Sequence, residues 1–263
     1  NVIHVFTLEG MGIPFWLTAA VVMLMIVLYT FQGGVKTIVW TDTLQTLFML
    51  AAMIGTIFWI AASPGMEGWG ERLSTSGMLG VWNLDWKSDG YFLKQVLSGI
   101  FITITMTGLD QEMMQKNLSV RTAEDSQKNM RVFSVVLIGV NMLFLLLGAL
   151  LWLKAGQMGV AAPEKSDMLF PTLALQHFPE WLGLLFIIGL ISALFPSADG
   201  ALTALTASTC IDLIGIRDRG WDEARQKLVR RTVHLLMAGV FLLCILWFHH
   251  RQDPTMINTV FSL

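Results

Sequence analysis

The sequence has 263 residues, of which 54% are hydrophobic and 14% charged, and its mean hydropathy is +0.63. Soluble domains carry about 25% charged residues and about 45–50% apolar residues, so the composition favours a membrane protein over a soluble enzyme. The formal net charge is −2, which argues against a strongly acidic partner such as nucleic acid. We therefore expect membrane lipid, and no nucleic acid, around the protein.

Long apolar stretches predict membrane-spanning helices. A hydrocarbon core about 30 Å thick needs about 20 residues of helix. The stretches lack the period-two alternation of strands, and an open sheet cannot cross lipid. We predict an all-α, multi-pass membrane protein with spans at residues 12–31, 37–62, 91 to about 115, 132–153, 181 to about 214, and 232–248.

Basic residues predict the orientation of these spans. The segments that follow the first, third and fifth spans carry eleven Lys and Arg residues, and the opposite side carries six. Cytoplasmic segments are enriched in Lys and Arg, so we expect Asn1 on the outer side. Trp69, Trp82 and Trp86 fall in an outer loop, as interfacial aromatic residues should.

Asp42 is an ionisable residue near the start of the second predicted span. Such a residue costs about 2.5–3.5 kcal/mol on insertion scales and is a functional candidate for that reason. Thr37, Thr41 and Gln45 form a polar stripe at i, i+4 and i+8, and Asp42 borders it. The alternative is that Asp42 lies at the cytoplasmic boundary and reaches water.

Asp199 lies midway along the fifth predicted span. Ser192, Asp199, Thr203 and Thr206 share one helix face at i, i+7, i+11 and i+14. Close helix packing explains small residues, but it does not explain a carboxylate. We therefore expect this segment to have a functional role.

Pro196 precedes Asp199 by three residues and lacks a backbone N–H. The carbonyl of Ser192 consequently loses its helical partner. Hard cations prefer oxygen ligands, and distorted helices at mid-membrane commonly build ion sites in transporters. The alternative is a kink that serves packing alone.

The third predicted span contains Thr103, Thr105 and Thr107, followed by Gly108 and Asp110. This pattern is typical of a helix that loosens and faces a wet cavity. Threonine hydroxyls also bond to the preceding turn of their own helix, and Asp110 then simply approaches the cytoplasmic surface. Both interpretations stay open at this point.

Three segments resemble the solute:sodium symporter family, and they occur in the family's order. They are Gly33-Gly34-Val35-Lys36 with Trp40-Thr41-Asp42 and Gln45, then Asp110-Gln111 with Gln115-Lys116-Asn117-Leu118-Ser119, then Pro196-Ser197-Ala198-Asp199 through Cys210-Ile211-Asp212. The resemblance implies a leucine-transporter-like bundle with inverted repeats. It also implies that residues 1–263 form a single transmembrane domain, part of a longer transporter core.

The resemblance further implies a sodium ion as the coupling ion. By the family's motif, Ala193 offers a carbonyl and Ser197 a hydroxyl to the main sodium site. The family usually places a second hydroxyl where this sequence has Pro196. Asp42 matches an aspartate tied to sodium release or to a second ion site, and Asp199 stands where some members have a serine of that second site. A proton at Asp199 is the alternative to sodium.

The resemblance also implies a substrate pocket. Met106, Thr107 and Asp110 match positions that line or gate it, and Thr103 lies one turn earlier. The sugar carriers of the family have aromatic residues near these positions, and their absence here argues against a sugar.

The function implied by the resemblance is sodium-coupled symport of a small organic solute by alternating access. The location it implies is a plasma membrane, and we expect a bacterial inner membrane. Three alternatives remain. They are a transporter-like sensor module, an inactive transporter suggested by Pro196, and a membrane enzyme that uses His249 and Asp253, a possible metal pair at i and i+4. We expect no enzymatic activity.

Overall fold

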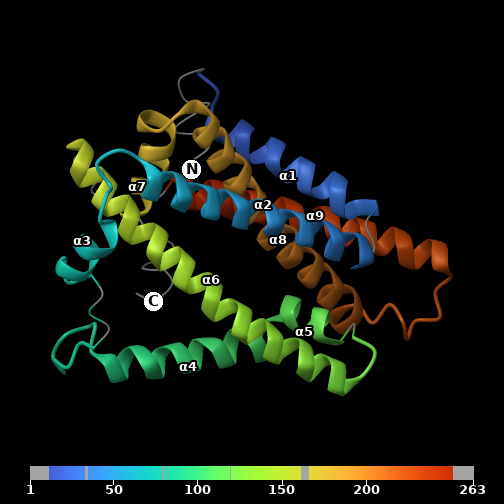
Figure 1. The fold of residues 1–263 in the computed structure, drawn as a ribbon. Coiled ribbons are helices and arrows are strands. Elements are labelled where there is room, and N and C mark those ends of the chain that lie inside the picture. Colours follow the sequence, from blue (N-terminus) through green and yellow to red (C-terminus); the bar gives the residue numbers. More distant parts are fainter. Residues whose placement is uncertain are drawn as a thin grey trace. The chain divides into compact units, whose positions relative to one another are not determined.

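The computed structural model describes residues 12–32, 35–78, 80, 82–118, 120–160 and 166–250. Gly33, Gly34, Ser119 and Asp253, which the sequence analysis singled out, lie outside these ranges. Every regular element within them is a helix (Figure 1). In chain order the elements are α1 (Phe15–Gln32), α2 (Val35–Ala62), α3 (Trp69–Thr75), α4 (Phe92–Gly108), α5 (Gln111–Leu118), α6 (Ala123–Met158), η3 (Ser166–Met168), α7 (Leu169–Thr172), η4 (Leu173–His177), α8 (Glu180–Ser208), η5 (Thr209–Leu213) and α9 (Glu223–His250).

The chain divides into two compact units. The first comprises residues 1–52 and 163–263, and the second comprises residues 53–162. Helix α2 therefore begins in the first unit and ends in the second. The prediction of a single transmembrane domain over residues 1–263 stays a prediction.

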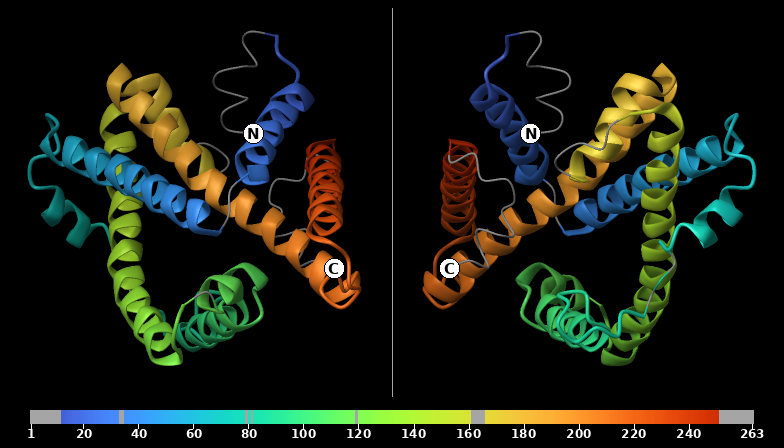
Figure 2. Two further views of the ribbon diagram at one scale, coloured as in Figure 1. Left: turned by 90° about the vertical axis from the view of Figure 1, so that its right-hand side faces the viewer. Right: turned by 90° about the vertical axis from the view of Figure 1, so that its left-hand side faces the viewer.

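The first unit is built on contacts among α1, α8 and α9. Met23, Ile26 and Val27 of α1 are buried against Leu202 of α8 and Ala238 of α9. The three α1 residues stand at i, i+3 and i+4, so they form one apolar stripe along the helix. Figure 2 shows the three helices of this core from two opposite sides.

Helices α2 and α8 approach each other closely at Gly189. A Cβ atom at Gly189 would lie 2.6 Å from the Cβ of Ala52 and 3.9 Å from the Cα of Met49. Small residues at a helix crossing allow this close approach. The two helices run in opposite directions (Figure 1). Because Asp42 is ten residues before Ala52 and Asp199 ten residues after Gly189, both carboxylates lie about 15 Å from the crossing, toward the same end.

The second unit contains the end of α2 and helices α3 to α6. Lys154 of α6 is buried, and its Nζ lies 2.8 Å from Gln157 Oε1 and 3.5 Å from the carbonyl oxygen of Pro64. The same ammonium group lies 5.8 Å from the ring centroid of Trp59. These polar and cation–π contacts compensate for the burial of a lysine. They hold the C-terminal ends of α2 and α6 together.

Each of the six predicted spans coincides with a helix. Helices α2, α6, α8 with η5, and α9 are long and apolar enough to cross a membrane, and α1 and α4 are shorter apolar helices. The predicted extent of the third span, to about residue 115, is wrong. Helix α4 ends at Gly108, and the Leu109 N–H closes its last turn on the carbonyl of Thr105 at 2.9 Å. A separate helix, α5, begins at Gln111.

The close approach at Gly189 generates the first prediction. We expect Gly189→Ala to lower the free energy of unfolding by about 1–3 kcal/mol, because the added methyl group overpacks the crossing. Thermal unfolding of the purified protein in detergent measures this change. Ala52→Gly removes the opposing methyl group, so the double variant should regain most of the lost stability. Equal stability of Gly189→Ala and the wild type would contradict the packing described here.

Candidate functional site

The polar face predicted for α8 is largely buried in the first unit. Ser192 and Thr206 are 8% and 5% exposed, and Asp199 has no exposed surface. Thr206 Oγ1 donates to the carbonyl of Leu202 at 2.7 Å. Both carboxylate oxygens of Asp199 and the hydroxyl oxygen of Thr203 are shielded from solvent. The helix therefore presents oxygen atoms to its neighbours, and not to the surrounding medium.

Helix α2 contributes further buried oxygens to the same unit. Asp42 Oδ1 and Gln45 Oε1 are shielded from solvent, one turn apart on the helix. Asp42 as a whole is half-buried, so its role stays a prediction. Burying a carboxylate is expensive unless hydrogen bonds or cations compensate for it. The oxygens of α2 and α8 are thus suited to a bound cation.

Tyr29 of α1 connects these two helices. Its hydroxyl contacts Thr41 Oγ1 of α2, and it interacts with the carboxylates of both Asp199 and Asp42. Tyrosine combines a large apolar ring with a hydroxyl that needs a polar partner when buried. Tyr29 therefore marks the place where α1, α2 and α8 bring their polar side chains together. We refer to Tyr29, Thr41, Asp42 and Asp199 as the carboxylate cluster.

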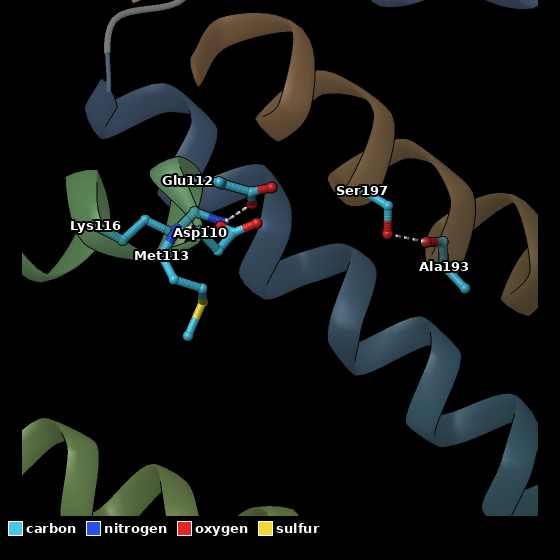
Figure 3. Close-up of polar contacts among 6 residues, drawn as sticks. All are labelled: Asp110, Glu112, Met113, Lys116, Ala193 and Ser197. Carbon is cyan, nitrogen blue, oxygen red and sulfur yellow. Dashed lines mark hydrogen bonds and ion pairs between the residues drawn. The ribbon is translucent and has the colours of Figure 1, made fainter. Parts of the chain in front are cut away.

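Ala193 and Ser197 lie on a different face of α8. Both residues are exposed within the chain. Ser197 Oγ turns back toward the carbonyl oxygen of Ala193, to which it donates at 3.5 Å (Figure 3). Ser197 and Asp199 are two residues apart, about 200° around the helix. The four predicted ion ligands therefore form two groups: Ala193 with Ser197, and Asp42 with Asp199.

Pro196 does not interrupt α8, which continues as one helix from Glu180 to Ser208. Because proline has no N–H, the Ser192 carbonyl one turn earlier has no helical donor. This carbonyl lies next in sequence to that of Ala193. Two neighbouring carbonyl oxygens and the Ser197 hydroxyl are hard oxygen donors of the kind that alkali and alkaline-earth cations prefer.

The predicted substrate residues lie in the second unit, at the end of α4. Thr103, Met106 and Asp110 are exposed, and Thr107 is half-buried. Thr103 Oγ1 donates to the carbonyl of Gly99 at 2.8 Å. Its hydroxyl therefore bonds within its own helix, which is the alternative to facing a wet cavity. The structure places these four residues on one continuous stretch of chain, and their role in binding a solute stays a prediction.

Asp110 has a structural role that the sequence reading missed. Its Oδ1 accepts a hydrogen bond from the backbone N–H of Met113 at 2.8 Å, which caps the N-terminus of α5 (Figure 3). Along α5, Lys116 forms an ion pair with Glu112 at 2.6 Å. An aspartate followed by a new helical turn is a common N-terminal signal. That signal was present in the sequence and explains the break between α4 and α5.

Comparison with known proteins decides the family. The sequence profile of the sodium:solute symporter family matches residues 5–263. The chain belongs to the sodium:solute symporter family.

Curated relatives within the family are sodium-coupled transporters. The chain is 27% identical over 251 residues to the sodium-dependent multivitamin transporter of Oryctolagus cuniculus, covering 89% of this chain and 38% of the relative. It is 25% identical over 244 residues to sodium-coupled monocarboxylate transporter 1 of Mus musculus, covering 89% of this chain and 39% of the relative. The chain thus spans about two fifths of the length of these relatives.

A solved symporter structure confirms the predicted fold class. The chain matches a substrate-bound, outward-open structure of a Na⁺-coupled sialic acid symporter with a TM-score of 0.81 and 16% identity. The match covers 95% of this chain and 55% of that one. The chain therefore has the predicted leucine-transporter-like helical fold, and it belongs to a multi-pass membrane protein.

Two polar residues of the first unit, Tyr29 and His234, have no sequence motif that marks them. Tyr29, one of two tyrosines in the chain, lies in the apolar first span and needs a partner for its hydroxyl. His234 is an ionisable residue inside the sixth predicted span, and the rule that selected Asp42 and Asp199 applies to it equally.

His249, proposed as half of a metal pair, stacks on Phe15 of α1 with 3.7 Å between ring centroids.

The cap at α5 generates the second prediction. We expect Asp110→Ala to destabilise the first turn of α5 by about 1 kcal/mol, because the N-terminal N–H groups lose an acceptor. Hydrogen exchange at the Met113 and Met114 amides should accelerate about fivefold. Asp110→Asn keeps an acceptor oxygen and removes the charge, so exchange should stay close to the wild-type rate. Solute binding lost in Asp110→Asn with exchange unchanged would assign the carboxylate to the solute; unchanged exchange in Asp110→Ala would refute the cap.

Proposed function

We propose that this chain is the ion-binding part of a sodium-coupled symporter, which moves a small organic solute across the plasma membrane by alternating access. One observation carries the proposal: the fully buried carboxylate of Asp199 and the half-buried carboxylate of Asp42, on two adjacent helices, in a chain of this family. A buried anionic cluster needs positive charge to offset its desolvation, and sodium is the ion to which the relatives are coupled.

The proposal has two ion positions. The first uses the carbonyl of Ala193 and the hydroxyl of Ser197, and the second uses Asp42 and Asp199. Sodium bound at either position joins several oxygen ligands. Binding energy of this kind shifts a conformational equilibrium as far as the ion prefers one state over the other. Sodium entering from outside thus stabilises the outward-open state.

The solute in this proposal meets the chain at the end of α4. Thr103, Met106, Thr107 and Asp110 offer hydroxyl, thioether and carboxylate groups without an aromatic ring. This set supports a small polar solute and not a sugar ring that stacks on an aromatic side chain. The location we propose is a plasma membrane, and a bacterial inner membrane stays a prediction from the family resemblance.

Equilibrium binding of ²²Na⁺ to the purified full-length protein is the third prediction. We expect saturable binding that Ser197→Ala weakens about tenfold or more, which corresponds to about 1.4 kcal/mol. Ser134→Ala is the matched control: Ser134 Oγ also donates to the carbonyl four residues earlier, Met130, at 2.8 Å, but on the exposed face of α6. The control variant should bind sodium as the wild type does.

Asp199→Asn separates the two ion positions. The substitution keeps the size of the side chain and removes its charge, so we expect it to lower the number of sodium ions bound or the affinity of a second site. Ser197→Ala should leave that second site in place. Absence of saturable sodium binding in the wild type would overturn the proposal, and proton coupling through Asp199 or a sensor function would then replace it.

A further inference from the structure

His234 joins three helices of the first unit through both nitrogens of its ring. It lies in α9 and is 7% exposed. Its Nε2 is 2.8 Å from Thr30 Oγ1 of α1, and its Nδ1 is 3.1 Å from Thr206 Oγ1 of α8. These contacts make one buried side chain the polar link among α1, α8 and α9.

Counting protons shows which form of the ring fits this link. Thr30 Oγ1 also lies 2.8 Å from the carbonyl oxygen of Ile26, and Thr206 Oγ1 lies 2.7 Å from that of Leu202. Each hydroxyl has one proton to donate. While both hydroxyls donate to their carbonyls, both ring nitrogens must donate to the hydroxyls. That arrangement requires the doubly protonated imidazolium ring.

A neutral ring needs a different arrangement at the same positions. Neutral imidazole has one donor nitrogen and one acceptor nitrogen. One threonine hydroxyl must then turn its proton from the backbone carbonyl to the ring. The carbonyl keeps its backbone N–H partner within the helix, so this rotation is inexpensive. Both protonation states therefore fit without moving a helix, and they differ in the direction of one hydrogen bond.

Charged and titratable groups surround the link on every packed element. On α8, Asp199 is seven residues from Thr206, about 10 Å along the helix. On α1, Tyr29 precedes Thr30 and interacts with Asp199. On α9, Arg230 and Arg231 lie one turn before His234, with Arg230 near Cys210 of η5. On η5, Asp212 accepts a hydrogen bond from Ser208 at 2.7 Å.

Burial of the ring opposes a positive charge at His234, because desolvation penalises the charged form. Two hydrogen bonds donated by an imidazolium offset part of that cost. Histidine is the side chain that changes its charge near physiological pH, and its surroundings determine at which pH this happens.

We propose that His234 is a proton-binding site, and that the proton switches the hydrogen bonds joining α1 to α8 and α9. With the proton bound, the ring donates to both threonines and makes two charge-assisted bonds. Without the proton, one bond reverses and both are neutral. The ligand is a proton, distinct from the sodium ion and the solute of the proposed function, and the site gives the helix junction a dependence on pH.

Nuclear magnetic resonance of the full-length protein in nanodiscs tests this site directly. The sequence holds five histidines, and ¹⁵N labelling of their rings reports the protonation of each nitrogen. The His234 signals are assigned as those lost in His234→Gln and kept in His250→Gln, whose side chain is exposed at the end of α9. We expect two protonated nitrogens in acidic buffer and one in alkaline buffer.

Thr206→Val provides the matched test of the hydrogen-bond count, and it is needed if His234→Gln folds poorly. Valine has the shape of threonine and lacks the hydroxyl acceptor. We expect the ratio of doubly to singly protonated ring at a fixed pH to fall about tenfold, the effect of losing one charge-assisted bond. Thr43→Val, at an exposed position of α2, should leave the ratio unchanged.

Either of two results would overturn the proposal: the same protonation state of His234 in acidic and in alkaline buffer, or the same ratio in Thr206→Val and the wild type. The ring signals report proton binding at His234 and can be recorded in buffer without sodium. A protein that fails to bind sodium but shows the titration would refute the proposed function and leave the proton site supported.

Discussion

The burial of Asp199 is the constraint on which the rest of the first unit depends. A carboxylate in the middle of an apolar helix is expensive in a membrane, and this one has no exposed surface. The neighbouring helices offset part of that cost by placing polar groups near Asp199: Tyr29 from α1 and the stripe around Asp42 from α2. The polar groups of three helices therefore come together around Asp199 of α8.

Close packing sets that convergence. Gly189 has no side chain, so the Ala52 methyl group of α2 packs directly on the backbone of α8. This contact fixes the register of the two helices. Asp42 and Asp199 are equally distant from the crossing, so they fall at the same level. Further along the same face of α8, Thr206 joins α9 and α1 through His234 and Thr30. One helix thus connects a carboxylate cluster with a protonatable link, and Thr203 lies between them on its polar face.

Much of this arrangement was predictable from the sequence, and for a physical reason. Long apolar stretches locate helices because each must fill the thickness of the bilayer, and all six predicted spans have a helix. The buried face of α8 followed from the spacing of Ser192, Asp199 and Thr206. The family was also predictable, because three motifs stood in the right order.

Other features depend on tertiary contacts and were not predictable from one-dimensional patterns. The end of α4 depends on Asp110 capping α5, a local signal that the apolar run concealed. Tyr29 and His234 acquire their importance from partners 12 to 204 residues away. The separation of Ser197 from Asp199 could be inferred from helix geometry, but which face of α8 meets α1 and α2 could not. The roles of Ala193, Ser197, Asp42 and Asp199 in binding sodium stay predictions.

Hydrogen–deuterium exchange of α8 in the full-length protein tests the central claim, that buried oxygens of this helix hold a cation. It would be measured in sodium and in potassium at equal ionic strength. If sodium binds at α8, amide exchange across residues 192–206 should slow in sodium, while exchange in α6 at residues 132–145 should stay the same. Identical exchange of α8 in the two salts would contradict the account.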